Sequence, residues 1–475
     1  MKKIKIVNEF QNINTNHIDY VLKKLFIMAI ILIPFDNLPY LENVLGELGV
    51  RGTVYLFIPI IILTIVNLII NREIFIPKGK YKYSFLLFLT WIIICILVNV
   101  PNIINNSFKG RTGSEKLILQ VLVVAFMISI SYCSIYIIER NNINKENLRN
   151  YIALSLIPVG IYSFFELFNI FNIIDFSGII EKLSYLIHTY YRGEVYPKGI
   201  RSVTGEASYF AMYASFAFPF IFSYIFTEKN LNKRLMWIAI NLYFMILIIF
   251  TKSRTAYAII FIELFLFFIF ILTSKVEPIK KKICIFLMVG LGIAFMFLNK
   301  TIIPMYAGDN NSVSKISVVS LYESIKDRNN MSNVARIGMQ RAALNIGKDN
   351  AVFGVGLGQY GFFVNEYVDE VAMTSDEVQR WINPDNDKKY WPPVFSLYHR
   401  IIAEEGFIGF FIWIIIIIYG LYRLIKKIYT NTDDVLSIVF TVSYVGVFIC
   451  SYNADTFAII QMWLCFAFLQ KQLLE

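Results

Sequence analysis

Four groups of ionisable residues stand beside strongly apolar segments, where charge is costly to bury and is usually functional. Arginine binds phosphate groups through paired hydrogen bonds, and a glutamate or histidine can take a proton from a hydroxyl. The pattern predicts a site for an anionic group, such as a diphosphate, next to a general base. The residues are Arg201 and Glu206 before one apolar run, Arg254 between two runs, Arg336 and Arg341 in a segment of helical spacing, and His399 before a later run.

The composition predicts that these residues are positioned by membrane-spanning helices. Of the 475 residues, 57% are hydrophobic and only 16% are charged, whereas about a quarter are charged in soluble proteins. We therefore expect an all-α polytopic integral membrane protein with about 12 transmembrane helices. The expected spans are 21–35, 54–70, 83–100, 117–138, 151–170, 208–227, 235–251, 255–274, 283–299, 405–425, 435–452 and 455–470.

Lysine and arginine gather in every second short loop, which predicts the orientation. They precede the first span and recur near residues 80, 145, 230, 280 and 425, so we expect both termini to be cytoplasmic. The formal net charge of +10 follows this bias, so we expect no nucleic-acid partner. All five cysteines fall inside expected spans, which excludes a disulfide framework in the outer loops.

Two loops on the outer side carry most of the remaining polar residues. We expect residues 1–299 to form transmembrane helices 1–9 with an outer loop at 171–207, residues 300–404 to form a long extracytoplasmic loop, and residues 405–475 to form helices 10–12. "VSKISVVSLYESIKD" and "VARIGMQRAALNIGK" in the long loop have helical apolar spacing, which predicts amphipathic helices. The charged groups named above all face this side.

The long loop also contains two patterns that resemble ligand motifs. "FGVGLGQYGF" is rich in glycine, but no Lys-Ser/Thr follows, so it predicts a tight backbone approach rather than a P-loop. Asp385 and Asp387 form an Asp-x-Asp pair among Asn and Pro residues, which is typical of a turn. Aromatic residues of the outer loops, among them Tyr209 and Trp391, could stack on sugar rings or form an interfacial belt.

In their order along the chain, these elements resemble the O-antigen polymerase and O-antigen ligase-like family of membrane glycosyltransferases. The resemblance is carried by "RSVTGEASYFA", "TKSRTAY", "ARIGMQRAALNIGKDNAVFGVGLGQY" and "AEEGFIG", and it covers about residues 195 to 412. It implies a polymerase that transfers glycan from a polyprenyl-diphosphate-linked donor to a lipid-linked acceptor at the outer face of the cytoplasmic membrane. Inversion at the anomeric carbon would follow from a single displacement.

The resemblance also implies roles for the charged residues. The diphosphate and glycan would be bound by Arg201, Arg254, Arg336, Arg341 and Tyr209, and the catalytic residues would be Glu206, His399 and Arg254. Either Glu206 or His399 would be the base, and Glu206 could instead only complement a helix dipole. The resemblance implies neither a metal nor a cofactor. The expected partners are the lipid-linked oligosaccharide, membrane lipid and, where the pathway has one, a chain-length regulator.

One departure from the family pattern bears on the reaction type. Ligases of this family carry a histidine before Asn, Ser or Gln at a fixed distance from Gly-x-x-Gly. Counting back from Gly406 and Gly409 places Ser396 in the second position and Phe395 in the histidine position. This favours a polymerase over a ligase. A flippase or exporter for the same lipid-linked sugar is a further alternative, although the spans are largely free of charge in mid-helix, except for Glu166 and Glu263.

Overall fold

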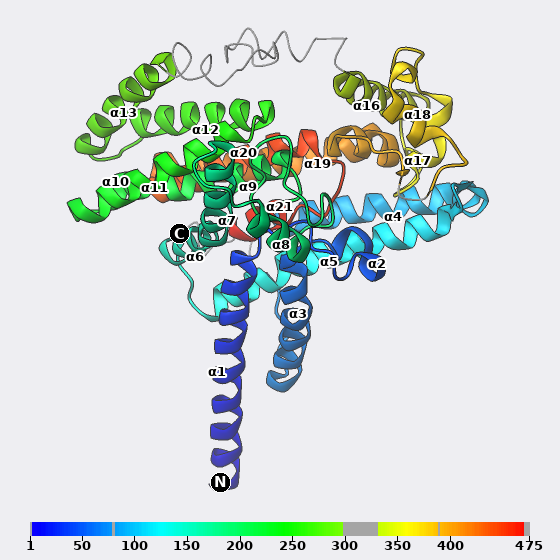
Figure 1. Cartoon of the computed structure of the whole chain (residues 1–475). Coiled ribbons are helices and arrows are strands. Elements are labelled where there is room, and N and C mark those ends of the chain that lie inside the picture. The colour runs from blue at the N-terminus through cyan, green and yellow to red at the C-terminus, as the bar shows by residue number, and fades with distance from the viewer. Residues whose placement is uncertain (1, 78–80, 298–330, 388–389, 470–475) are drawn as a thin grey trace.

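The computed structural model describes residues 2–77, 81–297, 331–387 and 390–469, and these residues are almost entirely helical (Figure 1). Nine helices within the described part are long and apolar enough to cross a membrane. They lie at 52–71, 82–105, 113–140, 145–170, 207–227, 231–250, 254–273, 397–430 and 435–453. The all-α membrane architecture is therefore confirmed, whereas the count of about 12 spans stays a prediction.

The elements have the following bounds. They are α1 (Lys2–Ile31), α2 (Glu42–Leu45), η1 (Gly46–Leu48), α3 (Gly52–Asn71), α4 (Tyr81–Asn105), β1 (Ser107–Phe108), β2 (Arg111–Thr112), α5 (Gly113–Arg140), α6 (Lys145–Leu154), α7 (Leu156–Ile170), α8 (Ser177–Ile187), α9 (Ala207–Phe222), α10 (Tyr224–Thr227), α11 (Leu231–Phe250), α12 (Arg254–Thr273), α13 (Pro278–Phe297), α16 (Met331–Asp349), α17 (Tyr360–Phe363), η3 (Val364–Glu366), η4 (Ala372–Thr374), α18 (Asp376–Ile382), α19 (Leu397–Thr430), α20 (Val435–Cys450), η6 (Ser451–Asn453) and α21 (Ile460–Phe468).

Two expected spans take a different form. The expected span 455–470 contains α21, a helix of nine residues and therefore only about 14 Å long, which is shorter than the roughly 30 Å hydrocarbon core. The tenth expected span begins earlier than its apolar run, because α19 starts at Leu397 with Ser396 as its N-cap. His399, Arg400 and Glu404 thus belong to this long helix.

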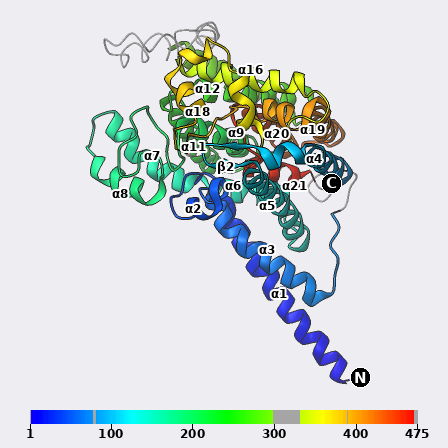
Figure 2. The same cartoon turned by 90° about the vertical axis from the view of Figure 1, so that its right-hand side faces the viewer.

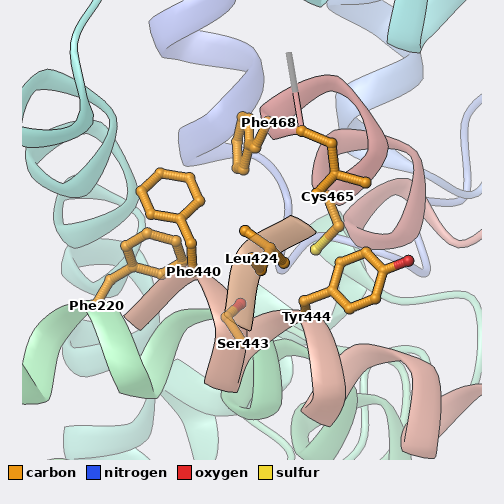
Figure 3. Close-up of a pocket in the computed structure, with 8 residues that line it drawn as sticks. Phe220, Leu424, Phe440, Ser443, Tyr444, Cys465 and Phe468 are labelled. Atoms are coloured by element: carbon orange, nitrogen blue, oxygen red, sulfur yellow. The ribbon is translucent and has the colours of Figure 1, made fainter. Parts of the chain in front are cut away.

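The centre of the bundle is α9. Within its span, 94% of the residues are buried, and α9 packs against α12 and α20. A small apolar gap lined by Phe220, Leu424 and Phe440 lies beside it (Figure 3). Its cavity volume of about 10 Å³ is too small for a sugar. At the periphery, α1 and α3 lie side by side and project from the other helices (Figures 1 and 2).

Successive connections between helices lie alternately at the two ends of the bundle, and contacts join the connections that share an end. At one end, named here the basic end, Lys145 Nζ contacts Asp434 at 2.6 Å and Lys280 contacts Asp433. At the other, named here the site end, the Ile200 amide donates to the Phe250 carbonyl at 2.9 Å. The connections that meet at the site end are 32–51, 106–112, 171–206, 251–253, 390–396 and 451–459. The alternation expected from the basic loops is thus reproduced by the contacts.

A second, smaller core covers the site end of α19. It contains Ala335, Met339 and Ile346 from α16, together with Val364 and Val378 from the following helices. The prediction of a helix over "VARIGMQRAALNIGK" is confirmed by α16. The prediction for "VSKISVVSLYESIKD", residues 313–327, lies outside the described residues.

The glycine-rich turn approaches the backbone of α19 closely, as its composition predicted. Gly406 interrupts α19 with φ 71° and ψ −179°. The main-chain groups released by this kink are bonded to the turn: Val355 donates to Ala403 O, Gly356 donates to Glu404 O, and Phe407 donates to Ala351 O, each at 2.9 Å. The kink therefore fixes the polar first turns of α19 against the turn.

Replacing Gly406 by alanine should destabilise the protein by about 1–3 kcal/mol or more, because alanine is strained at this φ and its Cβ would lie 2.3 Å from Val352 O. Thermal unfolding of the purified protein in detergent measures the effect. Gly290→Ala is the matched control, because a Cβ at Gly290 in α13 would have no neighbour within 4 Å. Equal melting temperatures for the two variants would contradict this account of the kink.

Candidate functional site

Glu206 lies at the site end, directly before α9. It is the N-cap residue of α9, yet its side chain makes no capping hydrogen bond. Its described side-chain bond is a weak one from Ser208 Oγ at 3.5 Å. Glu206 therefore does not cap α9 through a hydrogen bond, and its role as a base or as a charge that complements the helix dipole stays a prediction.

Two residues that the sequence did not single out lie beside Glu206. Asp36 Oδ1 accepts the Gly205 amide at 2.7 Å, which fixes the turn before Glu206. Arg51 Nη1 lies 3.9 Å from Asp36 Oδ2, and its guanidinium lies 5.5 Å from the ring centre of Tyr209. Burial raises the pKa of Asp36 to about 6, with the neighbouring Glu206 charge adding to it and Arg51 opposing it. We name Asp36, Arg51, Glu206 and Tyr209 the Glu206 cluster.

Asp36 and Arg51 come from the short connection 32–51, which the sequence analysis did not treat as a polar loop. The signal that could have found them is "FDNLPYLENVLGELGVRG", where charges recur between two apolar runs. Arg51 is also the residue directly before α3. Its Nε is buried without a hydrogen-bond partner in the described part of the chain.

Arg201 is fully buried and is already bonded to protein groups. Its guanidinium donates to Tyr190 O at 2.7 Å and to Ser184 Oγ at 3.0 Å, and it lies 5.1 Å from the ring centre of Tyr196. These bonds fold the 184–205 segment into the turn that presents Glu206. The structure thus gives Arg201 a positioning role, and its contact with a diphosphate stays a prediction.

Glu166 also stabilises the turn before Glu206. Its carboxylate accepts the Ser202 amide at 2.8 Å and the Arg201 amide at 3.4 Å. His188 is buried nearby, with its ring 5.6 Å from that of Tyr162. Burial and the Arg201 charge lower the pKa of His188 to about 3, so His188 is neutral near pH 7 and adds no positive charge. Glu166 is therefore a structural acceptor at the site end, as opposed to a transport group.

Arg254 contacts α16, the helix that carries Arg336. Arg254 Nη2 donates to Asn333 Oδ1 at 3.1 Å, and Arg336, one turn further along α16, lies 5.4 Å from the ring centre of Phe395. Residues three apart share a helix face. This face of α16 therefore joins the start of α12 to the segment before α19. The binding of a diphosphate by Arg254 and Arg336 stays a prediction.

Phe395, in the position of the ligase histidine, has an unusual backbone. Its φ is +61°, a left-handed conformation that is uncommon for a bulky residue. Gln340 Nε2 donates to its carbonyl at 3.2 Å, which ties this conformation to α16. Ser396 follows as the N-cap of α19, and Gly406 is the kink in the same helix, so the family-type spacing from Ser396 to Gly406 runs from a helix cap to a kink.

His399 and Arg341 differ in their surroundings. His399 Nδ1 lies 3.0 Å from Ser396 Oγ, and its half-buried ring lies 5.7 Å from that of Tyr452. Arg341 forms an ion pair of 3.4 Å with Asp369, and its side chain is 59% exposed. His399 is thus half-buried between Ser396 and Tyr452, whereas Arg341 lies on a solvated surface. Their roles toward a substrate stay predictions.

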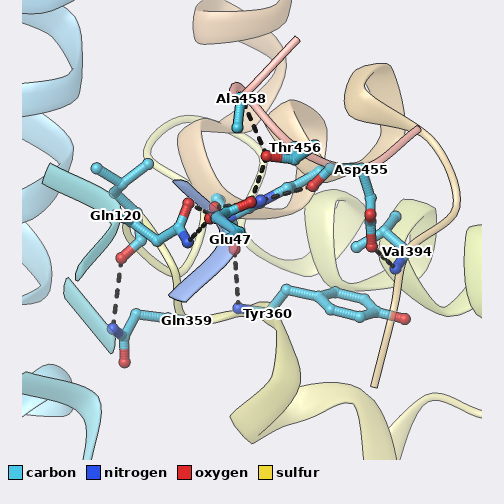
Figure 4. A network of polar contacts seen from close by, with 11 residues as sticks. Glu47, Gln120, Gln359, Tyr360, Val394, Asp455, Thr456 and Ala458 are labelled. Atoms are coloured by element: carbon cyan, nitrogen blue, oxygen red, sulfur yellow. Dashed lines mark hydrogen bonds and ion pairs between the residues drawn. The ribbon is translucent and has the colours of Figure 1, made fainter. Parts of the chain in front are cut away.

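A buried polar network is centred on Arg400. Figure 4 shows its members Glu47, Gln120, Asp455 and Thr456. Arg400 donates to Glu404 Oε2 at 3.1 Å, to Asp455 O at 2.6 Å and to Gln120 Oε1 at 2.6 Å. Gln120 Nε2 in turn donates to Glu47 Oε1 at 2.7 Å, and Thr456 Oγ1 donates to Glu47 Oε2. We name these residues the Arg400 network. It joins four segments that are distant in sequence.

Glu47 is ionised inside this network. Burial by itself raises the pKa of Glu47, but the Arg400 charge and the hydrogen bonds from Thr456 and Gln120 outweigh burial and hold the pKa below its ordinary value. Asp455 extends the network, because its Oδ2 accepts the Val394 amide at 2.8 Å. Asp455 also lies within electrostatic reach of Tyr209, which connects the network to the Glu206 cluster.

An apolar cavity runs from the site end along α19 and α20. It has a volume of about 390 Å³ and is lined by Tyr398, Phe448 and Tyr452, with Ile417, Leu421, Tyr444, Val445 and Ile449. It runs between α19 and α20 and ends at Tyr452, beside His399. Within the described residues, no group of three or more His, Cys, Asp or Glu side chains is placed to hold a metal ion.

Replacing Arg400 by methionine should destabilise the protein by about 3–5 kcal/mol, because Glu47 and Glu404 would lose their buried counter-charge. Thermal unfolding in detergent measures this loss. Lys426→Gln, an exposed change on the same helix, is the control and should unfold like the original protein. A stable Arg400→Met protein would show that the network is not required for folding.

Part of the chain is similar to a known protein family. Residues 238–414 match the model of the family described as O-Antigen ligase. The matched segment begins in α11 and includes Arg254, α16, the glycine-rich turn and the first turns of α19. No curated protein sequence matches the chain. The family match confirms the resemblance that the motifs indicated: the central part of this multi-pass membrane protein is similar to the O-antigen ligase family.

Proposed function

We propose that the protein is a polysaccharide polymerase, which transfers glycan from a polyprenyl-diphosphate-linked donor to a lipid-linked repeat-unit acceptor. The observation that carries the proposal is the gathering of a free carboxylate, Glu206, and of arginines at one end of a membrane-spanning bundle. The family match supports glycan chemistry of this general kind. The basic connections at the opposite end support an outward-facing site with cytoplasmic termini.

In the proposed reaction, the acceptor hydroxyl oxygen attacks the anomeric carbon of the donor sugar. The bond from that carbon to the diphosphate oxygen breaks, and the hydroxyl proton passes to the Glu206 carboxylate. Arg254 and Arg336 stabilise the negative charge that develops on the departing diphosphate. A single displacement of this kind inverts the anomeric carbon and needs neither a metal nor a nucleotide sugar.

Phe395 favours a polymerase over a ligase. A phenyl ring cannot exchange a proton, and the φ of +61° together with the Gln340 contact holds this residue in place. The histidine nearest to Phe395 along the chain is His399, and its Nδ1 lies 3.0 Å from Ser396 Oγ. The apolar cavity that ends beside His399 could accommodate part of a polyprenyl chain, in keeping with a lipid-linked substrate.

The flippase alternative is disfavoured by the position of the charges. Glu166 is bonded to the main chain at the site end. Glu263 is buried in α12 against Gly446 without a hydrogen-bond partner among the described residues. Deleting the gene and locating the repeat units separates the classes. Single units on the outer leaflet without polymer support a polymerase, whereas units retained inside would support a transporter.

Glu206→Gln should reduce polymerisation by about 10²–10⁴-fold, because general-base catalysis contributes this much. The change is isosteric and disturbs no capping bond, so the protein should fold normally. Chain length of the surface glycan, measured by gel electrophoresis and mass spectrometry in a deletion strain, gives the result. Glu194→Gln, an exposed glutamate of the same loop, is the matched control. Normal chain length in Glu206→Gln would assign the base elsewhere.

Activity should fall as the pH decreases through about 6. Burial places the pKa of Asp36 at about 6, so Asp36 is charged above this pH and neutral below it. Once Asp36 is neutral, Arg51 loses its partner and can pair with Glu206, which weakens that base. The pH profile of polymerisation by purified protein tests this. Asp36→Asn should have low activity and no transition near pH 6, and an unchanged profile would exclude Asp36 as a positioning residue.

A further inference from the structure

A pair of cations with no bonded counter-charge lies at the start of α5. The Lys116 Nζ lies 4.6 Å and the Arg111 guanidinium 5.4 Å from the ring centre of Trp391. Neither side chain forms a salt bridge or hydrogen bond with any residue that the structure describes, and Arg111 Nε is buried without a partner. Two positive charges are thus concentrated over one indole ring. We name these three residues the Trp391 patch.

The carboxylates nearest to Lys116 are already engaged elsewhere. Glu47 and Glu404 lie within electrostatic reach of Lys116. Glu47 accepts from Gln120 and Thr456, and Glu404 accepts from Arg400 and from the Tyr360 amide at 3.3 Å. Arg400 adds a third positive charge to the surroundings. The start of the 28-residue helix α5 adds the positive end of a helix dipole.

The patch is held rigidly although its cations are not neutralised. Phe108 and Phe362 pack on Trp391, with ring centres 5.8 and 5.1 Å away. A Cβ at Gly361 would lie 2.5 Å from the indole, so the ring fits against bare backbone. Lys109 Nζ donates to the carbonyls of Arg380 and Tyr390 at 2.8 Å each, which fastens the β1–β2 hairpin to this segment. Such preorganised cations cost little to order when a ligand binds.

We propose that Arg111 and Lys116, supported by Trp391, form an anion-binding site for a phosphate or carboxylate group of the lipid-linked glycan. The choice of this ligand rests on the proposed function, whereas the prediction of anion binding rests on the patch alone. The anion has two sources, the diphosphate of the carrier or an acidic sugar of the glycan. Both present oxygens that a guanidinium and an ammonium group can contact together.

Calorimetric titration of the full-length protein in detergent tests the site with two probes, inorganic pyrophosphate and glucuronic acid. At least one should bind, and the double change Arg111→Gln with Lys116→Gln should raise its Kd at least tenfold. Lys348→Gln removes an exposed lysine of α16 and is the matched control. Lys116→Arg keeps the positive charge at this position and should retain binding.

The outcomes separate the sources and the proposals. Binding of pyrophosphate alone assigns the diphosphate, and binding of glucuronic acid alone assigns an acidic sugar. Absence of binding, or equal Kd values for the double variant and Lys348→Gln in proteins with equal melting temperatures, would overturn the site. Glu206→Gln should bind the probe normally, so loss of polymerisation there can be told apart from loss of anion binding.

Discussion

The structure depends on one buried charge, the Arg400 guanidinium. A buried arginine is tolerated only when its donors are bonded and its charge is balanced, and here Glu404, Gln120 and the Asp455 carbonyl meet that requirement. Because these acceptors come from different parts of the chain, satisfying Arg400 also fixes how α5, α19 and the segment before α21 approach. The same bonds give Glu47 a fixed ionised state, which carries the constraint into the connection between α1 and α3.

A second constraint acts on the turn that presents Glu206. Arg201 and Glu166 are both buried, and each is bonded to the main chain of this turn or of the loop before it. Main-chain groups bonded in this way are accommodated without water, which matters at the edge of a membrane. The charges that look most like ligands in the sequence are therefore partly scaffold. The charged groups whose hydrogen bonding is incomplete within the described part of the chain include Glu206, which makes no capping bond, and Arg51, whose Nε has no partner.

Several features were predictable because they depend on local sequence. The apolar runs predicted the membrane helices, and apolar spacing predicted α16. Glycine content predicted the close approach of the 354–361 turn, whose partner is α19. The chain order of the motifs indicated the family that residues 238–414 match. The Glu206 cluster was found only in part, since Asp36 and Arg51 are isolated charges in a short connection with no motif of their own.

By itself, the sequence determined that the chain enters a membrane, which connections lie at the same end, and that arginines and a glutamate gather there. These properties follow from hydrophobic length and charge alternation, which act over a few tens of residues. Only the tertiary structure decided which charge is scaffold and which is available. Arg201 and Arg51 are the same residue type in similar loops, and they differ because the folded chain supplies hydrogen-bond acceptors to both Nη groups of Arg201, whereas Arg51 forms an ion pair of 3.9 Å with Asp36.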